Sequence, residues 1–260
     1  ATSSLIILGG LGYIVWWDVL RVLKSRSQKN RKIFRHLTLH SKIAITVTAV
    51  LIFVGAIFIF IFEYSNPLTI GKMSLFDKIQ VSFFQSVTTR TAGFATIPQE
   101  NMTNASATVS IILMLIGGSP VGTAGGIKTV TIAILVCSAF ATIRNKKGAT
   151  LFGRRVSEES IKKAVAVVVM FLTICAISAI LLMATSNASA IDAVYEAVSA
   201  TATVGLSRNL TATLNTVGKL IIIVTMYFGR VGPISLAVAF GSKNESQNVI
   251  SEPTEDISIG

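Results

Sequence analysis

Long stretches without charged residues divide this chain. No Lys, Arg, Asp or Glu occurs in residues 43–62, 101–127 or 164–191. Each stretch reaches or exceeds the roughly 20 apolar residues that a helix needs to cross the hydrocarbon core of a bilayer. A further apolar segment opens the chain at Ser3–Val15 and is followed by two tryptophans, which are typical of a membrane interface. The pattern therefore predicts several membrane-spanning helices.

The rest of the chain divides into two similar units. Each unit consists of a span, a half-length helix, a Thr-x-Gly loop and a second apolar region. The parts of the first unit are Ile43–Phe62, Leu75–Val87, Thr88–Ile97 and Ala105–Ile143. The parts of the second unit are Ala164–Thr185, Ile191–Ala200, Thr201–Ser207 and Val217–Phe240. Together with the opening segment, the pattern predicts five crossings and two re-entrant hairpins.

The half-length helices are too short to cross a membrane. A helix of about 10–13 residues is only about 15–20 Å long, because each residue adds about 1.5 Å. Each must therefore enter the membrane and return on the same side. Non-helical backbone at membrane depth is tolerated only where protein buries it or where it lines a water-filled cavity. We therefore expect the two Gly-containing loops to face one shared aqueous path.

Composition and charge agree with a membrane protein. Hydrophobic residues make up 52% of the chain and charged residues 13%, and the mean hydropathy is +0.69. These values exclude a soluble enzyme, a disordered protein and a disulfide scaffold. No nucleophile–base pair, metal-ligand cluster or nucleotide-binding loop occurs in the sequence, so we expect no catalysis.

The formal net charge of +11 comes largely from two basic clusters, Arg21–Lys42 and Arg144–Lys163. Both lie between apolar segments, so the positive-inside rule predicts that they are cytoplasmic. The half-length helices would then enter the membrane from the outside. No aromatic residues alternate with the basic ones as a stacking platform would require, so nucleic acid is not an expected partner.

The two Thr-x-Gly loops align with each other and predict a cation site. Backbone carbonyls supply oxygen ligands to a dehydrated cation without adding net charge. Glycine at the third position permits a positive φ at little steric cost, which lets successive carbonyls point the same way. The preceding helix also directs its C-terminal end, about half a negative charge, to the same place. The expected ligand-bearing residues are Thr91, Ala92, Gly93 and Phe94, and Thr203, Val204, Gly205 and Leu206. An ordinary extracellular turn containing a glycine is the alternative.

The region from Ala105 to Ile143 is too long for one straight span and contains a cluster of helix breakers. A glycine inside a helix costs about 1 kcal/mol and a proline about 3 kcal/mol. We therefore expect the helix to break near mid-membrane, where serine and threonine hydroxyls serve the freed backbone groups. A tight turn outside the membrane is the alternative. The residues of the expected break are Gly117, Gly118, Ser119, Pro120, Gly122, Thr123, Gly125 and Gly126.

Three basic side chains next to these features are functional candidates. Arg90 precedes the first loop and is expected to brace it through hydrogen bonds; tuning of the local field is the alternative. Arg230 interrupts the last apolar region, where an ionisable residue marks a functional site by default. A snorkelling arginine that faces lipid is the alternative for that position. Lys128 is either a second electrostatic element or an interfacial anchor.

Three motifs carry a family resemblance: SVTTRTAGFATI at Ser86–Ile97, GGSPVGTAGGIKT at Gly117–Thr129 and YFGRVGPISL at Tyr227–Leu236. Together they resemble the membrane subunits of the Trk/Ktr/HKT potassium-transporter superfamily, most closely its KtrB members. The resemblance implies an all-α membrane protein built from M1–P–M2 repeats like those of potassium channels, with re-entrant pore loops and a broken inner helix. Four such repeats are implied, of which this chain would hold the end of the second and all of the third and fourth.

The resemblance also implies a division of the chain and a role for each part. The two loops would form two quarters of a single-file K⁺ filter. The glycine-rich segment would be a gate beneath that filter, with Arg230 in the cavity below it. The implied divisions are 1–42, the last helix of a preceding repeat and a basic loop; 43–147, the third repeat with its broken M2; 148–242, the fourth repeat; and 243–260, a cytoplasmic tail.

Partners follow from the same resemblance. It implies a homodimer in the lipid bilayer of the cell membrane, as in a bacterial inner membrane. A disordered tail is the simplest interpretation of the polar residues 243–260, and a position at the dimer interface, as in the family, is the alternative. A cytosolic ring of nucleotide-binding regulatory subunits, KtrA in the closest relatives, would dock on the basic inner face. The transported ion would be K⁺, and Na⁺ is a candidate coupling ion.

Two other classes of protein are alternatives, and the sequence disfavours both, because its loops lack TVGYG, a glycine-rich break is present and its repeats run parallel. A two-pore-repeat potassium channel predicts TVGYG-like filters and no glycine-rich break. A secondary transporter for a small solute, built on broken helices, predicts inverted repeats and a pocket at the midplane of the membrane.

Overall fold

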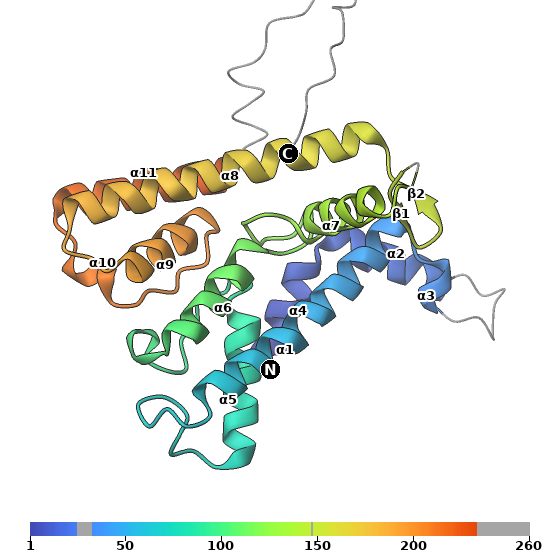
Figure 1. Cartoon of the computed structure of the whole chain (residues 1–260). Coiled ribbons are helices and arrows are strands. Elements are labelled where there is room, and N and C mark those ends of the chain that lie inside the picture. Colours follow the sequence, from blue (N-terminus) through green and yellow to red (C-terminus); the bar gives the residue numbers. More distant parts are fainter. Residues whose placement is uncertain (25–32, 147, 233–260) are drawn as a thin grey trace, which may run out of the picture.

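The computed structural model describes residues 1–24, 33–146 and 148–232, and nearly all of its regular structure is helical (Figure 1). The elements are α1 Thr2–Leu11, α2 Tyr13–Lys24, α3 Ile33–His36, α4 Leu39–Glu63, α5 Leu75–Thr88, η1 Gln99–Asn101, α6 Asn104–Leu115, α7 Thr129–Ile143, β1 Thr150–Leu151, β2 Arg154–Arg155, α8 Glu158–Thr185, α9 Ala190–Thr201, α10 Leu210–Thr213 and α11 Thr216–Val231. The expected tail 243–260 and the end of the last apolar region, from 233 to Phe240, lie outside the described residues.

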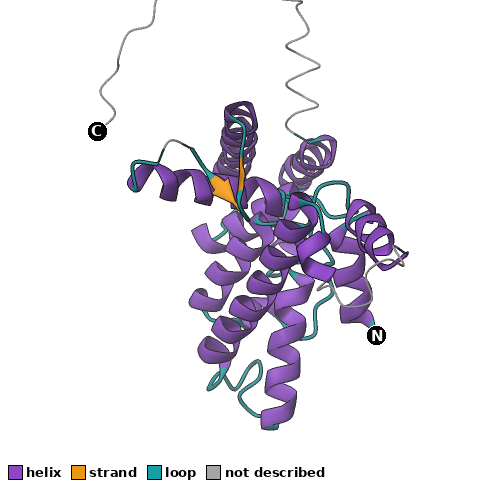
Figure 2. Ribbon diagram, turned by 90° about the vertical axis from the view of Figure 1, so that its right-hand side faces the viewer, coloured by secondary structure: helices purple, strands orange, loops and turns teal. Residues whose placement is uncertain are grey.

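Strands β1 and β2 form a small antiparallel hairpin that the all-helical expectation did not include. It lies within the second basic cluster, after the end of α7 and before the start of α8 in the chain; its strands are orange in Figure 2. Each strand has two residues, so the hairpin adds little to the fold.

Two described helices are long and apolar enough to cross a bilayer: α4 with 25 residues and α8 with 28. The number rises to three if the bent pair α1–α2 counts as one span. Helix α4 begins at Leu39, four residues before the expected Ile43, because the Thr38 hydroxyl accepts a hydrogen bond from the Ser41 amide and caps the helix. Helices α6, α7 and α11 have 12, 15 and 16 residues, so the five expected crossings depend on how the broken segments combine.

The opening segment differs from the single straight span that the sequence predicts. Helices α1 and α2 meet at Gly12 with a bend of 90°, and the second helix continues to Lys24. Gly12 has φ 76°, and a Cβ there would lie 3.0 Å from the carbonyl oxygen of Pro120 and the amide nitrogen of Gly122. A residue with a side chain would therefore be strained at this position and would collide with the glycine-rich segment.

The two predicted units have the same local construction. Helices α5 and α9 occupy the expected half-length segments, and they extend them by no more than one residue at either end. Ser74 caps α5 by accepting from the Asp77 amide at 3.2 Å, and Ser189 caps α9 by accepting from the Asp192 amide at the same distance. Helix α5 packs on α4 and α9 packs on α8, so each half-length helix is held by the long helix that precedes it.

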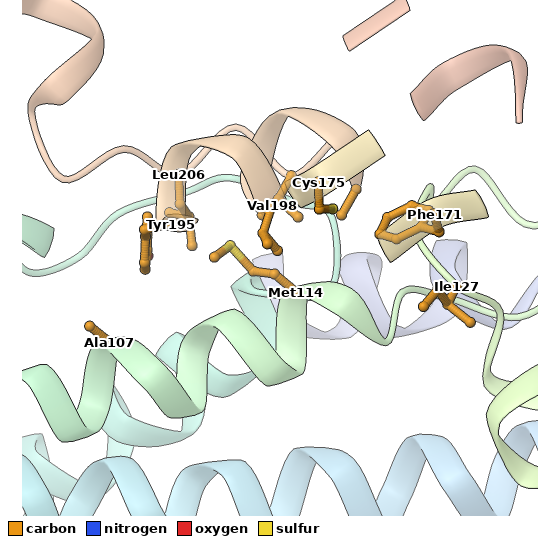
Figure 3. Close-up of a cluster of buried hydrophobic side chains, with 10 residues drawn as sticks. Ala107, Met114, Ile127, Phe171, Cys175, Tyr195, Val198 and Leu206 are labelled. Atoms are coloured by element: carbon orange, nitrogen blue, oxygen red, sulfur yellow. The ribbon is translucent and has the colours of Figure 1, made fainter. Parts of the chain in front are cut away.

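The units meet along a seam between α6 and α9. Met114 and Val198 face each other across this seam, with Tyr195 and Leu206 beside them (Figure 3). Helix α11 packs against both α8 and α9, and Figure 1 shows it running alongside α8. The seam is buried and apolar, so it fixes the second half-length helix against the first unit.

Candidate functional site

The two Thr-x-Gly loops lie against each other, although they belong to different units. A Cβ placed on Gly93 would come within 3.0 Å of the carbonyl oxygen of Val204. From the other side, a Cβ placed on Gly205 would lie 3.9 Å from the Cα of Gly93. The backbones of the two loops are therefore in direct contact, with no room for a side chain on Gly93.

The two loops also share an unusual backbone conformation. Thr91 has φ 61° and Gly93 has φ 73°, while Thr203 has φ 56° and Gly205 has φ 94°. The residue between them in each loop is absent from the positive-φ region. Positive φ is uncommon for threonine, so surrounding contacts must hold this conformation. Alternation of the sign of φ changes the direction of successive peptide groups, so that carbonyls of such a loop can face one side, as backbone carbonyls do in cation filters.

Hydrogen bonds from the ends of the half-length helices hold both loops. The Thr88 hydroxyl accepts from the Phe94 amide at 2.8 Å and donates to the Phe94 carbonyl at 2.7 Å. In the second loop, the Ser199 hydroxyl accepts from the Gly205 amide at 3.2 Å, and the Ser199 carbonyl accepts from the Val204 amide at 2.9 Å. Both loops thus fold back on the C-terminal ends of α5 and α9.

Arg90 connects the first loop to the broken helix. The side chain is 5% exposed, and its Nη2 donates to the Thr48 hydroxyl at 3.2 Å and to the Gly117 carbonyl at 3.1 Å. Nη1 is buried and has no hydrogen-bond partner among the described groups. Arg90 therefore bonds to α4 and to the start of the break, which is the geometry of a brace.

The break separates α6, which ends at Leu115, from α7, which begins at Thr129. Backbone hydrogen bonds close the segment at its base. The Gly117 amide donates to the Ile127 carbonyl at 2.9 Å, and the Ile127 amide donates to the Leu115 carbonyl at 3.0 Å. The Ser119 hydroxyl pairs with that of Thr129 at 3.3 Å rather than with the freed backbone groups that the sequence suggested. The segment is therefore a closed loop with bonded ends.

This glycine-rich loop contacts the second Thr-x-Gly loop on one side and the bend of α1–α2 on the other. A Cβ on Gly125 would come within 3.0 Å of both the Thr203 hydroxyl and the Ala202 carbonyl. The Ser119 amide donates to the Gly10 carbonyl at 2.9 Å. Of the expected break residues, Gly117, Gly118, Ser119, Pro120, Gly122, Thr123, Gly125 and Gly126 all lie between α6 and α7.

Two basic side chains donate to carbonyls of this loop. Arg230, near the end of α11, donates from Nη1 to Thr123 at 3.1 Å. Lys128 donates from Nζ to Ala124 at 2.5 Å. The Arg230 side chain is exposed in this chain. Both positively charged side chains therefore lie at the glycine-rich loop, where each partly offsets the dipoles of the loop carbonyls.

A cavity of about 350 Å³ lies where the first Thr-x-Gly loop, the glycine-rich loop and α1 meet. Residues from all three segments line it: Thr2, Leu5, Ile6, Gly9, Gly10, Arg90, Thr91, Ala92, Phe94, Thr123 and Ala124. Among the described residues, no group of three or more His, Cys, Asp or Glu side chains lies close enough to hold a metal ion. A cation at this site would therefore have backbone and hydroxyl oxygens as its ligands.

One buried carboxylate at the far end of α4 is not predicted by the sequence pattern. Glu63 at the end of α4 is 0% exposed and accepts from the side chains of Thr69 at 2.5 Å and Asn66 at 2.7 Å. It also accepts from the amide and the hydroxyl of Thr103, both at 2.8 Å. This carboxylate joins the end of α4 to the start of α6, around the first half-length helix. Its position directly after an apolar span is a signal, but the sequence does not reveal its partners.

Replacing Glu63 with alanine is expected to destabilise the protein by at least about 3 kcal/mol, because several donors lose their acceptor and each buried donor left without a partner costs about 1–3 kcal/mol. The melting temperature of the purified protein in detergent measures this loss. Glu159→Ala is the matched control: it removes a carboxylate from an exposed pair with Lys163, so the melting temperature should stay at the parent value. Equal melting temperatures for the Glu63→Ala and parent proteins would contradict the role of this network.

Known proteins share both the sequence and the fold. Residues 1–252 match the TrkH family, described as "Cation transport protein". The chain is 39% identical over 247 residues to Ktr system potassium uptake protein B of Bacillus subtilis, which covers 95% of this chain and 53% of that protein. It is 36% identical to the potassium/sodium uptake protein NtpJ of Enterococcus hirae, over 99% of this chain and 56% of that protein.

A solved structure has the same fold. The crystal structure of the potassium transporter TrkH from Vibrio parahaemolyticus superposes with a TM-score of 0.67 at 18% identity, covering 92% of this chain and 50% of that one. The chain thus spans about half the length of the relatives that it matches. The family match extends over nearly the whole sequence and includes both Thr-x-Gly loops and the glycine-rich loop, and the chain belongs to the TrkH family of cation transport proteins.

Proposed function

We propose that this chain forms part of a pathway for K⁺ uptake across the cell membrane. The carrying observation is the direct contact between Gly93 and Gly205, in two loops with positive φ at the same positions. Carbonyls from both loops line one ion path, and the C-terminal ends of α5 and α9 add negative potential there. K⁺ is the proposed ion because the relatives carry the printed names of potassium transporters. Na⁺ is a candidate coupling ion, in line with the name of NtpJ.

In this proposal the chain contributes two of four M1–P–M2 repeats. Residues 1–42 belong to the end of the second repeat and its basic loop, 43–147 to the third, 148–242 to the fourth and 243–260 to a cytoplasmic tail. The filter residues are Thr91, Ala92, Gly93, Phe94, Thr203, Val204, Gly205 and Leu206. Helices α5 and α9 are the re-entrant pore helices, and α6 with α7 is the broken inner helix.

The glycine-rich loop is the proposed gate. It lies against Thr203 and is bonded at its base, so a displacement of its middle part would widen or close the path without unfolding α6 or α7. Arg230 and Lys128 hold that middle part through carbonyls. Their positive charges also oppose the entry of a cation while the loop is in this position.

The proposal extends to the assembly. The basic clusters are the cytoplasmic face, on which a ring of nucleotide-binding subunits like KtrA docks, and two copies of the full-length protein form a homodimer in the bacterial inner membrane. The hairpin β1–β2 lies within this basic face and carries Arg154. These partners follow from family membership rather than from a contact in this chain.

Ion flux tests the proposal. The full-length protein that contains this sequence, reconstituted in liposomes, should take up ⁸⁶Rb⁺ along a K⁺ gradient, while a panel of amino acids and sugars should not enter. Uptake of an organic solute without Rb⁺ would favour the secondary-transporter alternative. Absence of any Rb⁺ or K⁺ flux in a folded, correctly inserted protein would refute the proposed function.

A further inference from the structure

We propose that Arg208 and Gln99 form a polar clamp between the two units that sets the spacing of the two Thr-x-Gly loops, and through it the preference between alkali cations. This inference rests on the proposed function and adds positioning residues outside the filter. The clamp consists of Gln85, Gln99, Asp192, Tyr195 and Arg208.

Arg208 follows the second loop by two residues and is directed into the first unit. Its side chain is 7% exposed. Nη1 donates to the backbone carbonyls of Gln99 at 3.1 Å and Met102 at 3.3 Å. Nη2 donates to the backbone carbonyl of Glu100 at 3.4 Å. One guanidinium therefore holds the turn that follows the first loop, about a hundred residues away in sequence.

The same guanidinium is tied to the second half-length helix. Its Nε donates to the Asp192 carboxylate at 2.6 Å. Asp192 lies in the first turn of α9, where it also accepts from the Ser189 hydroxyl at 2.6 Å. Burial raises the pKa of Asp192, but the hydrogen bonds from Ser189 and Arg208 and the charge of Arg208 outweigh it, and the pKa lies below its usual value. The carboxylate is therefore charged at neutral pH and holds Arg208 firmly.

Gln99 completes the connection at the centre of the clamp. The side chain is 2% exposed, and its Oε1 accepts from Gln85 of α5 at 2.6 Å and from the Tyr195 hydroxyl of α9 at 3.0 Å. Its Nε2 donates back to Gln85 at 3.2 Å and to the Ile97 carbonyl at 2.8 Å. A tyrosine hydroxyl keeps its proton at neutral pH, so Tyr195 can serve as the donor. Both half-length helices are thus hydrogen-bonded to one amide group.

These bonds determine the distance between the two filter loops. Helices α5 and α9 lead directly into the loops, so a fixed distance between Gln85 and Tyr195 fixes the distance between Gly93 and Gly205. Tyr195 is also part of the apolar seam between the units, beside Leu206 of the second loop (Figure 3). Selectivity between K⁺ and Na⁺ depends on the distance and number of the coordinating carbonyls. A change in this spacing should therefore alter the ion ratio.

The chemistry of arginine explains why this residue type occupies the position. Its planar guanidinium presents five donors in a rigid fork and can bond to a carboxylate and to several carbonyls together. A lysine has one donor centre and cannot reproduce the fork, although it preserves the charge. The substitution Arg208→Lys would therefore keep the ion pair with Asp192 and lose part of the contact with the turn at Gln99.

The experiment compares ⁸⁶Rb⁺ and ²²Na⁺ uptake by the full-length protein in liposomes. Tyr195→Phe removes one hydroxyl and leaves the ring in the seam; the Rb⁺/Na⁺ ratio is expected to fall about threefold. Arg208→Gln is expected to lower the Rb⁺/Na⁺ ratio about tenfold. Arg208→Lys should lower this ratio less than Arg208→Gln does. Lys219→Gln, which removes an exposed charge from the first turn of α11, is the control and should leave the ratio unchanged.

The ratio separates positioning from a general loss of structure. A purely structural role would reduce Rb⁺ and Na⁺ uptake in proportion, and an unchanged ratio in Tyr195→Phe and in the folded Arg208 variants would overturn the clamp. Should Arg208→Gln fail to fold, Tyr195→Phe and Arg208→Lys decide the matter alone. A parent protein without alkali-cation flux would overturn the proposed function and the clamp together, whereas parent flux with unchanged ratios overturns the clamp only.

Discussion

Replacing Gly93 with alanine is expected to lower K⁺ flux at least about tenfold while the protein remains folded. An alanine at φ 73° costs about 1–2 kcal/mol in backbone strain. Its Cβ would also press against the Val204 carbonyl. Overpacking of this kind costs about 1–3 kcal/mol, and each 1.36 kcal/mol changes a rate about tenfold. The displaced carbonyl belongs to the proposed filter, so the loss should be in ion passage.

Gly153→Ala is the matched control for this substitution. Gly153 has φ 77°, close to that of Gly93, but a Cβ there would meet nothing within 4 Å. The control therefore carries the backbone strain without the collision with Val204. ⁸⁶Rb⁺ uptake into liposomes should stay near the parent level for Gly153→Ala and fall for Gly93→Ala. Equal uptake by both variants would show that the contact between the two loops does not govern ion passage.

Replacing Arg230 with glutamine is expected to raise K⁺ flux about tenfold. A hydrogen bond from a charged donor contributes about 1.5–3 kcal/mol, and the exposure of Arg230 places its bond to Thr123 near the lower end. About 1.4 kcal/mol corresponds to a tenfold shift in the population of the displaced loop. Removal of the positive charge also lowers the electrostatic barrier to a cation at the loop.

Lys219→Gln provides the control for charge. Lys219 lies in the first turn of the same helix, far along α11 from Arg230, and is exposed. The Lys219→Gln substitution removes one positive charge from α11 without changing a contact of the glycine-rich loop. Uptake should rise for Arg230→Gln alone; a well-expressed Arg230→Gln protein with parent-like flux would argue for a snorkelling arginine that takes no part in gating.

Much of the site could be predicted from local patterns. Helices α5 and α9 match the expected half-length segments. This could be predicted because the length of an apolar segment decides whether it can cross a bilayer. The break between Leu115 and Thr129 was predictable because several glycines and a proline within a few helical turns make the free energy of a continuous helix unfavourable. Glycine at positions 93 and 205 was a sound signal for positive φ, whereas the positive φ of Thr91 and Thr203 was not predicted.

Other features had no local signal. The bend at Gly12 looked like the middle of a single span, because the contact that requires it comes from Pro120 and Gly122. The sequence pattern also gave no signal for the distant contacts of Glu63 with Thr103, 40 residues away, and of Arg208 with Gln99, 109 residues away. Such contacts depend on the angles at which helices pack, and these angles are set by the shapes of many side chains together.

The sequence by itself determined which segments are helices, where the inner helix breaks and which residues form the two loops, because each of these depends on the chemistry of a short stretch of chain. Only the tertiary structure decided that Gly93 touches Gly205, that Gly125 lies against Thr203 and that Arg208 holds the turn at Gln99. Those contacts join segments distant in sequence, and the burial of the α6–α9 seam brings them together.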